Sequence, residues 1–154
     1  MLALLDDPNV ADTEILYRRA SWEKIGGRGK TEPGQIAKIH HNFFSDYPKE
    51  AAERLGYSGP CMSVGLHSVI EQSGHRPEKM LENFPEFGLL MITVGELRRL
   101  KRASGEPCPQ GILASATLAE PWHGVVFDLE SPPRRDPAKK AIAMAADWLV
   151  PLIG

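Results

Sequence analysis

His123 is the residue of this sequence best suited by type and position to do chemistry. It lies in the stretch EPWHGVVFDL (120–129), between Trp122 and Gly124 and just before an apolar run. A neutral imidazole serves as general base or ligand near neutral pH, and loops at strand ends often carry functional sites. Trp122 could stack on a ligand ring, and Gly124 would let a ligand approach the backbone. The alternative is a turn whose tryptophan packs into the core.

Two adjacent arginines, Arg18 and Arg19, form a second candidate site at the end of an expected first strand. Successive side chains of a strand point to opposite faces, so one guanidinium is expected to face inward or line a cleft. An inward arginine is costly unless it is paired, and a phosphate or carboxylate ligand is a suitable partner. The alternative is an internal ion pair, for example with Asp12 or Glu14.

Ser63 interrupts an apolar strand in CMSVGL and lacks the G-x-S-x-G context of a nucleophile elbow. With Arg18 on an early strand and His123 at a late one, it resembles the spaced sites of ADP-ribosyltransferase-like proteins. The resemblance implies an enzyme acting on a nucleotide or phosphorylated ligand, with Arg18, Ser63 and His123 as catalytic residues. It rests on isolated residues: the family's glycine-rich motif and glutamate context are not clearly present, although Glu71 and Glu120 are available. The family is therefore not assigned.

Four basic residues surround the start of the last expected helix, where the helix dipole disfavours cations. They are Arg134, Arg135, Lys139 and Lys140. Cations at a helix start without a visible local partner suggest a role in binding, for example to an acidic partner or a phosphate backbone. The alternative is a solvated face.

No motif in the sequence predicts a metal or a cofactor. His40 and His41 are adjacent and point apart, whereas two histidines that share a metal on one helix prefer i, i+4 spacing. The loop GGRGKTEPG fails the P-loop spacing and indicates a flexible surface loop. A toxin-like ribonuclease that uses His40, His41 or His123 with nearby arginines is a further alternative.

The composition is that of an ordinary soluble protein. The chain has 154 residues, of which 42% are hydrophobic and 25% charged, so one domain over 1–154 is expected. Its net charge of -2 argues against a protein that coats nucleic acid in general. Cys61 and Cys108 are expected to be free thiols. The absence of a signal peptide and of a long apolar run predicts a cytoplasmic protein that does not contact membranes.

The pattern of apolar residues predicts an α+β fold, with a small mixed sheet, short helices packed on it and a C-terminal alanine-rich amphipathic helix. Residues 1–11 are expected to be a loose N-terminal segment and residues 23–35 a mobile loop. A capping box is expected at Thr93 and Glu96. Strands are expected over 12–20, 61–66 and 123–129, and a strand followed by a helix is expected over 87–104, with the apolar strand run at 89–94. Short helices are expected over 48–56, 67–74 and 76–84 and the last helix over 136–150, while 36–47 and 111–118 are ambiguous.

The function favoured by the sequence is a binding or accessory module without chemistry of its own. Its expected partner is a protein, a second copy of the chain or a phosphate-bearing ligand. The expected ligand contacts are Arg19, Trp122 and Gly124, and the expected partner contacts are the four basic residues of the last helix. The main alternative is the small enzyme that acts on a nucleotide or phosphorylated ligand, which requires Arg18 or Arg19, Ser63 and His123 to meet in one cleft.

Overall fold

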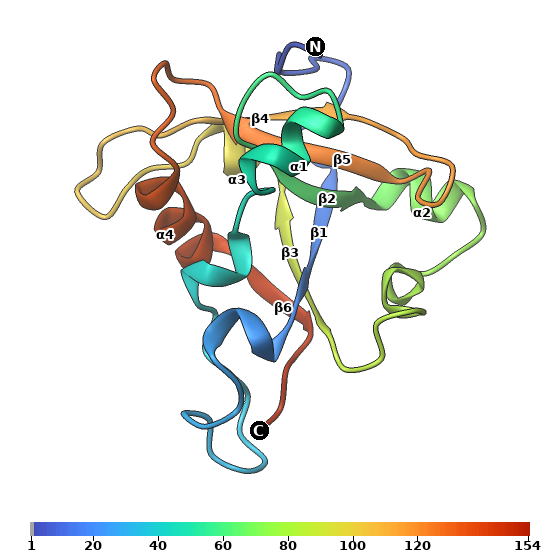
Figure 1. Cartoon of the computed structure of the whole chain (residues 1–154), viewed down its shortest axis with the longest axis vertical. Helices are drawn as coiled ribbons and strands as arrows, with labels where there is room; N and C mark the ends of the chain where they lie inside the picture. The colour runs from blue at the N-terminus through green and yellow to red at the C-terminus, as the bar shows by residue number, and fades with distance from the viewer. Residues whose placement is uncertain (1) are drawn as a thin grey trace.

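The computed structural model describes residues 2–154. It contains a six-stranded sheet with the strand order β4-β5-β2-β1-β3-β6 (Figure 1). The strands are β1 (Ile15–Ala20), β2 (Met62–Leu66), β3 (Gly88–Thr93), β4 (Gln110–Ala114), β5 (His123–Asp128) and β6 (Asp147–Val150). Every strand pair is antiparallel, where a mixed sheet was expected. Parallel neighbours need crossover connections, and the short helices of this chain do not serve as such crossovers.

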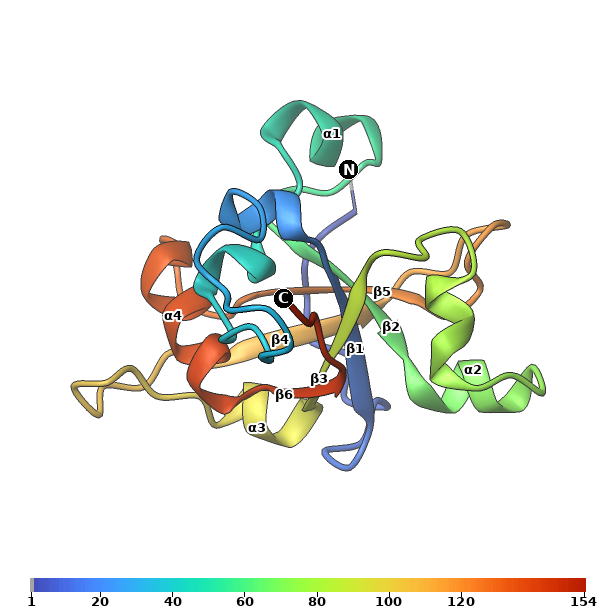
Figure 2. The same cartoon turned by 90° about the horizontal axis from the view of Figure 1, so that it is seen from below.

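Four α-helices and three 3-10 helices accompany the sheet, which confirms the α+β class. The α-helices are α1 (Lys49–Arg54), α2 (His67–Gln72), α3 (Val94–Arg98) and α4 (Arg135–Ala145). The 3-10 helices are η1 (Trp22–Ile25), η2 (His41–Phe44) and η3 (Pro77–Leu81). In both ribbon views α4 and α2 lie on opposite sides of the molecule (Figures 1 and 2).

The sheet buries one continuous core and two smaller ones. The continuous core joins Leu16, Val64 and Ile92 of the sheet to Phe43 of η2 and Ile142 of α4. The two smaller cores contain residues of the alternate strand positions, which point to the other face. One gathers Tyr17, Ile70, Met80, Leu89 and Trp122, and the other gathers Ala52, Tyr57, Cys61, Val125 and Phe127. The second face is therefore covered by two separate groups of elements, with α2 and η3 in one and α1 in the other.

The C-terminal helix is shorter than the sequence predicted. It starts at Arg135 and ends at Ala145, and Asp147–Val150 forms the edge strand β6 on β3. One face of the helix is buried, as expected of an amphipathic helix, through Ala138, Ala141 and Ile142. Leu149 lies in the strand. The strand has a physical reason: its aromatic and β-branched residues suit the open edge of β3, and Trp148 Nε1 donates to Ala37 O at 2.9 Å.

The capping box predicted at Thr93 is confirmed. Thr93 Oγ1 accepts from the backbone N–H of Glu96, whose carboxylate accepts from the Thr93 N–H. Helix α3 in turn anchors the N-terminal segment, because the Arg98 guanidinium bonds Asp6 and Asp12. Asp6 also accepts from the N–H of Ile112 on the edge strand β4. The looseness expected of residues 1–11 stays a prediction, and these contacts count against it.

Both cysteines are free and buried, as predicted. Burial raises the pKa of the Cys61 thiol to about 11. Between Leu2 and Gly154, no helix is long and apolar enough to cross a membrane.

Candidate functional site

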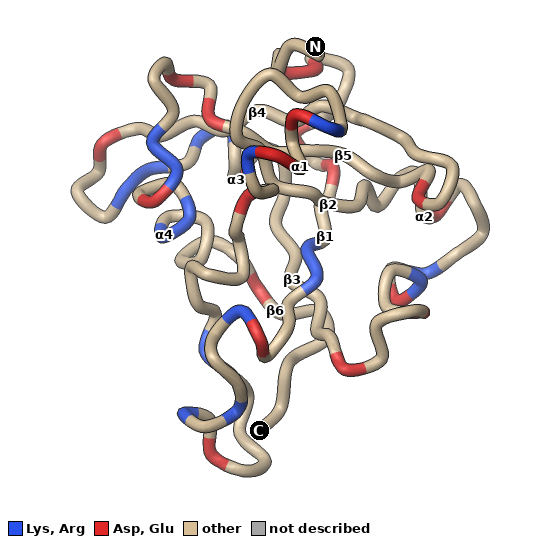
Figure 3. Tube along the Cα trace, viewed as in Figure 1, with Lys and Arg blue, Asp and Glu red and all other residues tan. Residues whose placement is uncertain are grey.

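The sheet opens between its two central strands. Only Leu16 with Leu66 and Tyr17 with Gly65 pair β1 to β2, while β1 pairs with β3 along all six of its residues. Beyond Tyr17 the two strands separate, and we call this separation the fork. The sequence places Arg18 and Arg19 at this point, and they form the basic segment of β1 seen near the middle of the trace (Figure 3).

Arg18 fills the fork with a guanidinium that is bonded only to uncharged oxygens. It donates to Phe43 O at 3.0 Å, Ser45 O at 2.9 Å, and both the carbonyl and the hydroxyl of Ser63 at 2.9 and 3.2 Å. Among residues 2–154, no carboxylate contacts it. Desolvation by burial lowers the pKa of Arg18 to about 10. The group stays cationic near neutral pH, but its charge is not neutralised by a direct contact.

Arg19 leaves the strand on the opposite side, as the alternation of side chains predicts. Its Nε donates to Met80 O at 2.5 Å, its Nη2 pairs with Glu120 Oε1 at 2.6 Å, and its guanidinium lies 4.2 Å from the centre of the Phe84 ring. These two hydrogen bonds use two of the five N–H groups of an arginine. The other three have no protein acceptor in the described part of the chain, so Arg19 can still bind an anion.

Both arginines line a cavity of about 190 Å³ at the fork, which we call the fork cavity. Its wall contains three cationic side chains, from Arg18, Arg19 and Lys24, and one carboxylate, from Glu120. The Ser63 and Ser21 hydroxyls also line it, and Ser21 is only 8% exposed and forms no helix cap. The wall thus combines an excess of positive charge with hydroxyl groups, which is the chemistry that binds an oxyanion.

A second cavity of about 380 Å³ adjoins the fork cavity, and we call it the side cavity. The two share Arg19, Met80, Phe84 and Glu120. Its remaining lining residues are Lys79, Glu82, Asn83, Ala119 and Trp122. The Arg19–Glu120 ion pair therefore belongs to the wall between the two cavities.

Gly65 allows the packing on which the side cavity depends. A Cβ at this position would overlap Met80 Sδ and come within 3.0 Å of Trp122 Cδ1. The bare backbone of β2 lets Met80 and Trp122 lie directly on the sheet. Nothing in the local sequence marks this glycine, because its requirement comes from residues far away in the chain.

His123 does not line the fork cavity or the side cavity. It is 6% exposed; its Nδ1 lies 2.8 Å from Ser115 O, and its Nε2 lies 2.9 Å from Tyr47 Oη. Since a carbonyl only accepts, Nδ1 carries the proton, and Nε2 accepts from the tyrosine. Both ring nitrogens are thus occupied within the protein. Burial raises the pKa of the Tyr47 hydroxyl, and a hydrogen bond with the Ser63 side chain offsets part of this rise. Tyr47 thus contacts both His123 and Ser63.

The structure therefore brings together part of the predicted site. Arg18, Arg19 and Ser63 share the fork cavity, and Trp122 lies in the adjoining one. Gly124 lines neither, and a Cβ there would lie 2.7 Å from Leu66 Cδ1, so packing accounts for this glycine.

Sequence reasoning did not assign ligand contacts to Ser21, Lys24, Met80 or Phe84. Only the basic composition of the loop after β1 gave a signal, and it pointed to Lys24.

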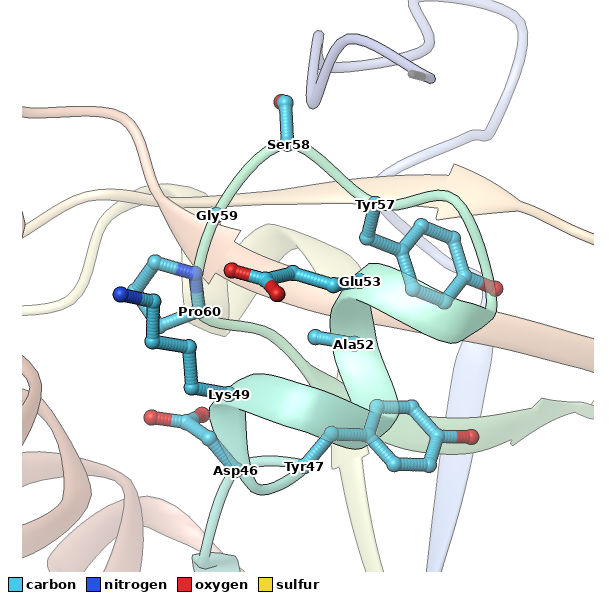
Figure 4. Close-up of a pocket in the computed structure, with 9 residues that line it drawn as sticks. All are labelled: Asp46, Tyr47, Lys49, Ala52, Glu53, Tyr57, Ser58, Gly59 and Pro60. Atoms are coloured by element: carbon cyan, nitrogen blue, oxygen red, sulfur yellow. The ribbon is translucent and has the colours of Figure 1, made fainter.

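A third cavity, of about 490 Å³, lies between α1 and the loop that leads to β2 (Figure 4). The rings of Tyr47 and Tyr57 line it, while Lys49 and Glu53 extend on the other side (Figure 4). The tyrosine hydroxyls already bond His123 and Ser115. With Asp46 and Glu53 beside Lys49, this cavity has no excess of positive charge.

Of the four basic residues around α4, Arg135 is buried in a polar cluster. It bonds Asp46 through Nε and Nη2 at 2.8–3.1 Å, and its Nη1 bonds Gln110 Oε1 at 2.6 Å and Asp128 Oδ1 at 2.5 Å. The ion pairs with Asp46 and Asp128 raise the pKa of Arg135 against the effect of burial. We call this group the α4 clamp. It gives a structural reason for a cation at this helix start.

The other three basic residues of this group differ in exposure. The Arg134 side chain is 55% exposed, and Lys140 is exposed as well. Lys139 lies 3.4 Å from Asp136 and is half-buried. A partner-binding role for the four residues stays a prediction, which Arg134 and Lys140 fit better than Arg135.

His40 and His41 stack on each other with their ring centres 4.2 Å apart. Desolvation and the neighbouring His40, Lys140 and Lys139 lower the pKa of His41. His40 lines a hollow of about 500 Å³ with Lys30, Lys38 and Glu32, away from both arginines of β1. Within residues 2–154, no group of three or more His, Cys, Asp or Glu side chains is placed to hold a metal ion.

Comparison with known proteins does not add a function. No protein-family model matches the chain, and no curated protein or solved structure matches it at a significant level. A function for this chain therefore has to be inferred from the geometry of its cavities.

Proposed function

We propose that the protein is a binding module for a small phosphate-bearing ligand, whose phosphate group occupies the fork cavity. One observation carries the proposal: three cationic side chains and a single carboxylate surround a cavity of about 190 Å³. The donors come from β1, β2 and the segment after β1, so they approach from different directions. A tetrahedral oxyanion suits such an arrangement better than a flat carboxylate, because its oxygens also point in different directions.

The charge of Arg18 favours the same ligand. Burying a cation without an opposite charge is unfavourable, as the lowered pKa of about 10 for this group shows. An anion in the fork cavity would offset part of that cost. Part of the binding free energy would then come from compensating the desolvated charge of Arg18.

Size limits what the fork cavity alone can hold. Pockets for drug-sized ligands usually measure roughly 300–1,000 Å³, and the fork cavity is smaller than that. It therefore fits a phosphate group, and any larger portion of the ligand must lie outside it.

Binding is favoured over nucleophilic catalysis by the partners of two residues. The Ser63 hydroxyl accepts from Arg18, a cation that cannot serve as a base. His123 has both ring nitrogens engaged and does not line this cavity. The enzyme alternative would need His123 to act on Ser63 through Tyr47, whose hydroxyl lies 2.9 Å from His123 Nε2.

Docking of an acidic partner on the start of α4 has less support. The α4 clamp explains Arg135 without a partner, and only Arg134 and Lys140 of the four basic residues are exposed. We therefore place the ligand at the fork.

Calorimetric titration with inorganic phosphate at constant ionic strength tests the proposal. Lys24→Ala removes an exposed cation of the cavity wall, and Lys101→Ala removes an equally exposed lysine elsewhere as the matched control. Lys24→Ala should weaken phosphate binding about 5-fold, which corresponds to roughly 1 kcal/mol for one partly exposed charge. Lys101→Ala should leave the affinity unchanged. The proposal fails if the unmodified protein gives no saturable phosphate signal, or if both substitutions weaken binding equally.

A further inference from the structure

The wall between the fork cavity and the side cavity is itself a charged contact. Arg19 Nη2 and Glu120 Oε1 are 2.6 Å apart, and both residues line both cavities. The Glu120 carboxylate occupies an arginine that a phosphate group would also bind. In the absence of ligand, Glu120 thus acts as an internal anion at the site.

The segment that carries Glu120 is only locally tied. The Glu120 N–H donates to Thr117 Oγ1 at 2.9 Å, and the Thr117 N–H donates to Glu120 O at 3.1 Å, which closes a small turn. Leu118, inside this turn, is fully exposed. The Glu120 side chain is 28% exposed, so its carboxylate can leave Arg19 for water without unfolding the sheet.

The side cavity offers aromatic and polar contacts. Phe84 and Trp122 line it, together with the polar side chains of Lys79 and Asn83. Trp122 is 6% exposed, and its buried Nε1 has no hydrogen-bond partner among the described residues. Buried indole N–H groups usually find an acceptor, so the Trp122 N–H is an exception among the described residues.

From these contacts we infer that the ligand is a phosphate joined to a planar ring, and that Glu120 is the gate between its two subsites. The inference rests on the proposed phosphate site. The phosphate replaces the Glu120 carboxylate on Arg19, the wall opens, and the ring enters the side cavity between Phe84 and Trp122. The two cavities, of about 190 and 380 Å³, then form one site within the usual size range for small ligands.

Glu120 would also determine specificity. A ligand that takes the Arg19 N–H held by Glu120 must displace a carboxylate, so a group with a single negative charge gains little from the exchange. A phosphate carries more charge and more acceptor oxygens than a carboxylate, and it compensates Arg18 as well. The gate therefore selects phosphates over carboxylates.

Calorimetric titration of three probes tests the inference: inorganic phosphate, phenyl phosphate and benzoate. On the unmodified protein, phenyl phosphate should bind about tenfold more tightly than inorganic phosphate, and benzoate should bind more weakly than either. Glu120→Gln should raise the affinity for inorganic phosphate about tenfold, because the competing charge is removed. The matched control is Glu130→Gln, which changes a carboxylate that pairs with Arg102 and lines neither cavity; it should leave inorganic phosphate binding unchanged.

The outcomes separate the two proposals. If neither phosphate nor phenyl phosphate binds the unmodified protein or the Glu120→Gln variant, the proposed function is wrong. If inorganic phosphate binds but phenyl phosphate gains nothing, the ring subsite is wrong. Equal phosphate affinity for Glu120→Gln and the unmodified protein, with both shown to be folded by circular dichroism, would overturn the gate. Benzoate binding as tightly as phenyl phosphate would overturn the selection of phosphate.

Discussion

Arg18 and Arg135 are two desolvated arginines of one chain whose hydrogen-bond acceptors differ in charge. Arg135 contacts two carboxylates, those of Asp46 and Asp128, whereas Arg18 contacts carbonyls and one hydroxyl. The pKa of Arg135 is raised, and that of Arg18 is lowered to about 10. A buried arginine whose charge is paired within the protein stabilises the fold. One whose charge is unpaired is the better candidate for binding a ligand.

The largest effect is expected from Arg135→Met. It leaves two half-buried carboxylates without their cation, and breaking a buried ion pair from one side costs about 3–5 kcal/mol. Urea denaturation measures the loss in free energy of unfolding. Arg134→Met is the control, since Arg134 is 55% exposed and 3.7 Å from Glu106; it should cost less than about 1 kcal/mol. Equal losses of stability in the two variants would show that the α4 clamp stabilises the fold no more than an exposed ion pair does.

Arg18→Met should cost less, about 1–3 kcal/mol. The carbonyls of Phe43, Ser45 and Ser63 lose a donor, but an uncompensated buried charge disappears at the same time. The sharper readout is the stabilisation by added phosphate at constant ionic strength. This stabilisation should vanish in Arg18→Met and persist in Arg135→Met. If the stabilisation by phosphate persisted in Arg18→Met and vanished in Arg135→Met, the ligand would bind near Arg135, and the proposed site would be wrong.

Cys61 gives a pH test of the region beside the α4 clamp. Its thiol ordinarily has a pKa of 9.0, which the fold raises to about 11, mainly through burial. A raised pKa means that the folded state holds the proton more strongly. Stability is therefore complete below pH 9 and falls as pH rises toward 11, by about 2–3 kcal/mol. Cys61→Ala should show a correspondingly smaller loss over the same pH range in urea denaturation, and an unchanged loss would refute the assignment.

The smallest effect concerns the two tryptophans whose indole N–H groups differ. Trp148 Nε1 donates to Ala37 O, whereas Trp122 Nε1 has no protein partner among residues 2–154. Trp148→Phe should therefore lose about 1 kcal/mol more from the hydrogen bond than Trp122→Phe does. Thermal unfolding of the two variants measures the difference. A larger loss from Trp122→Phe would indicate that its N–H already has an acceptor.

Local sequence patterns predicted most of the elements. The apolar run before Thr93 and the Thr93–Glu96 capping box predicted β3 and α3, because both depend on neighbouring residues. The end of α4 was wrong for the opposite reason: residues 147–150 leave the helix to pair with β3, about 60 positions earlier in the chain. The antiparallel pairing of all strands likewise depends on contacts between distant residues.

Local sequence patterns likewise predicted only part of the candidate site. The strand alternation at Arg18 and Arg19 predicted that they point to opposite sides, and the structure confirms this. Their acceptors include Ser45, Met80 and Glu120, which come from loops and from the 3-10 helix η3. No local pattern specifies where these segments lie relative to β1. The hypothesis that Arg135 serves a partner arose because a cation at a helix start is unfavourable, and its contact with Asp46, 89 positions earlier in the chain, was not predictable from local sequence.

The short pairing of β1 with β2 predicts a region of low local stability within the sheet. Two residue pairs join β4-β5-β2 to β1-β3-β6, whereas the pairings of β1 with β3 and of β4 with β5 are more extensive. Proteins open locally in cooperative units, and backbone amides exchange their hydrogens at rates set by the least costly opening. The seam between these two three-stranded units should exchange before either unit does. A ligand that bridges Arg18, Arg19 and Ser63 would slow hydrogen exchange there first. The exchange rates of the β1 and β2 amides would therefore measure ligand binding.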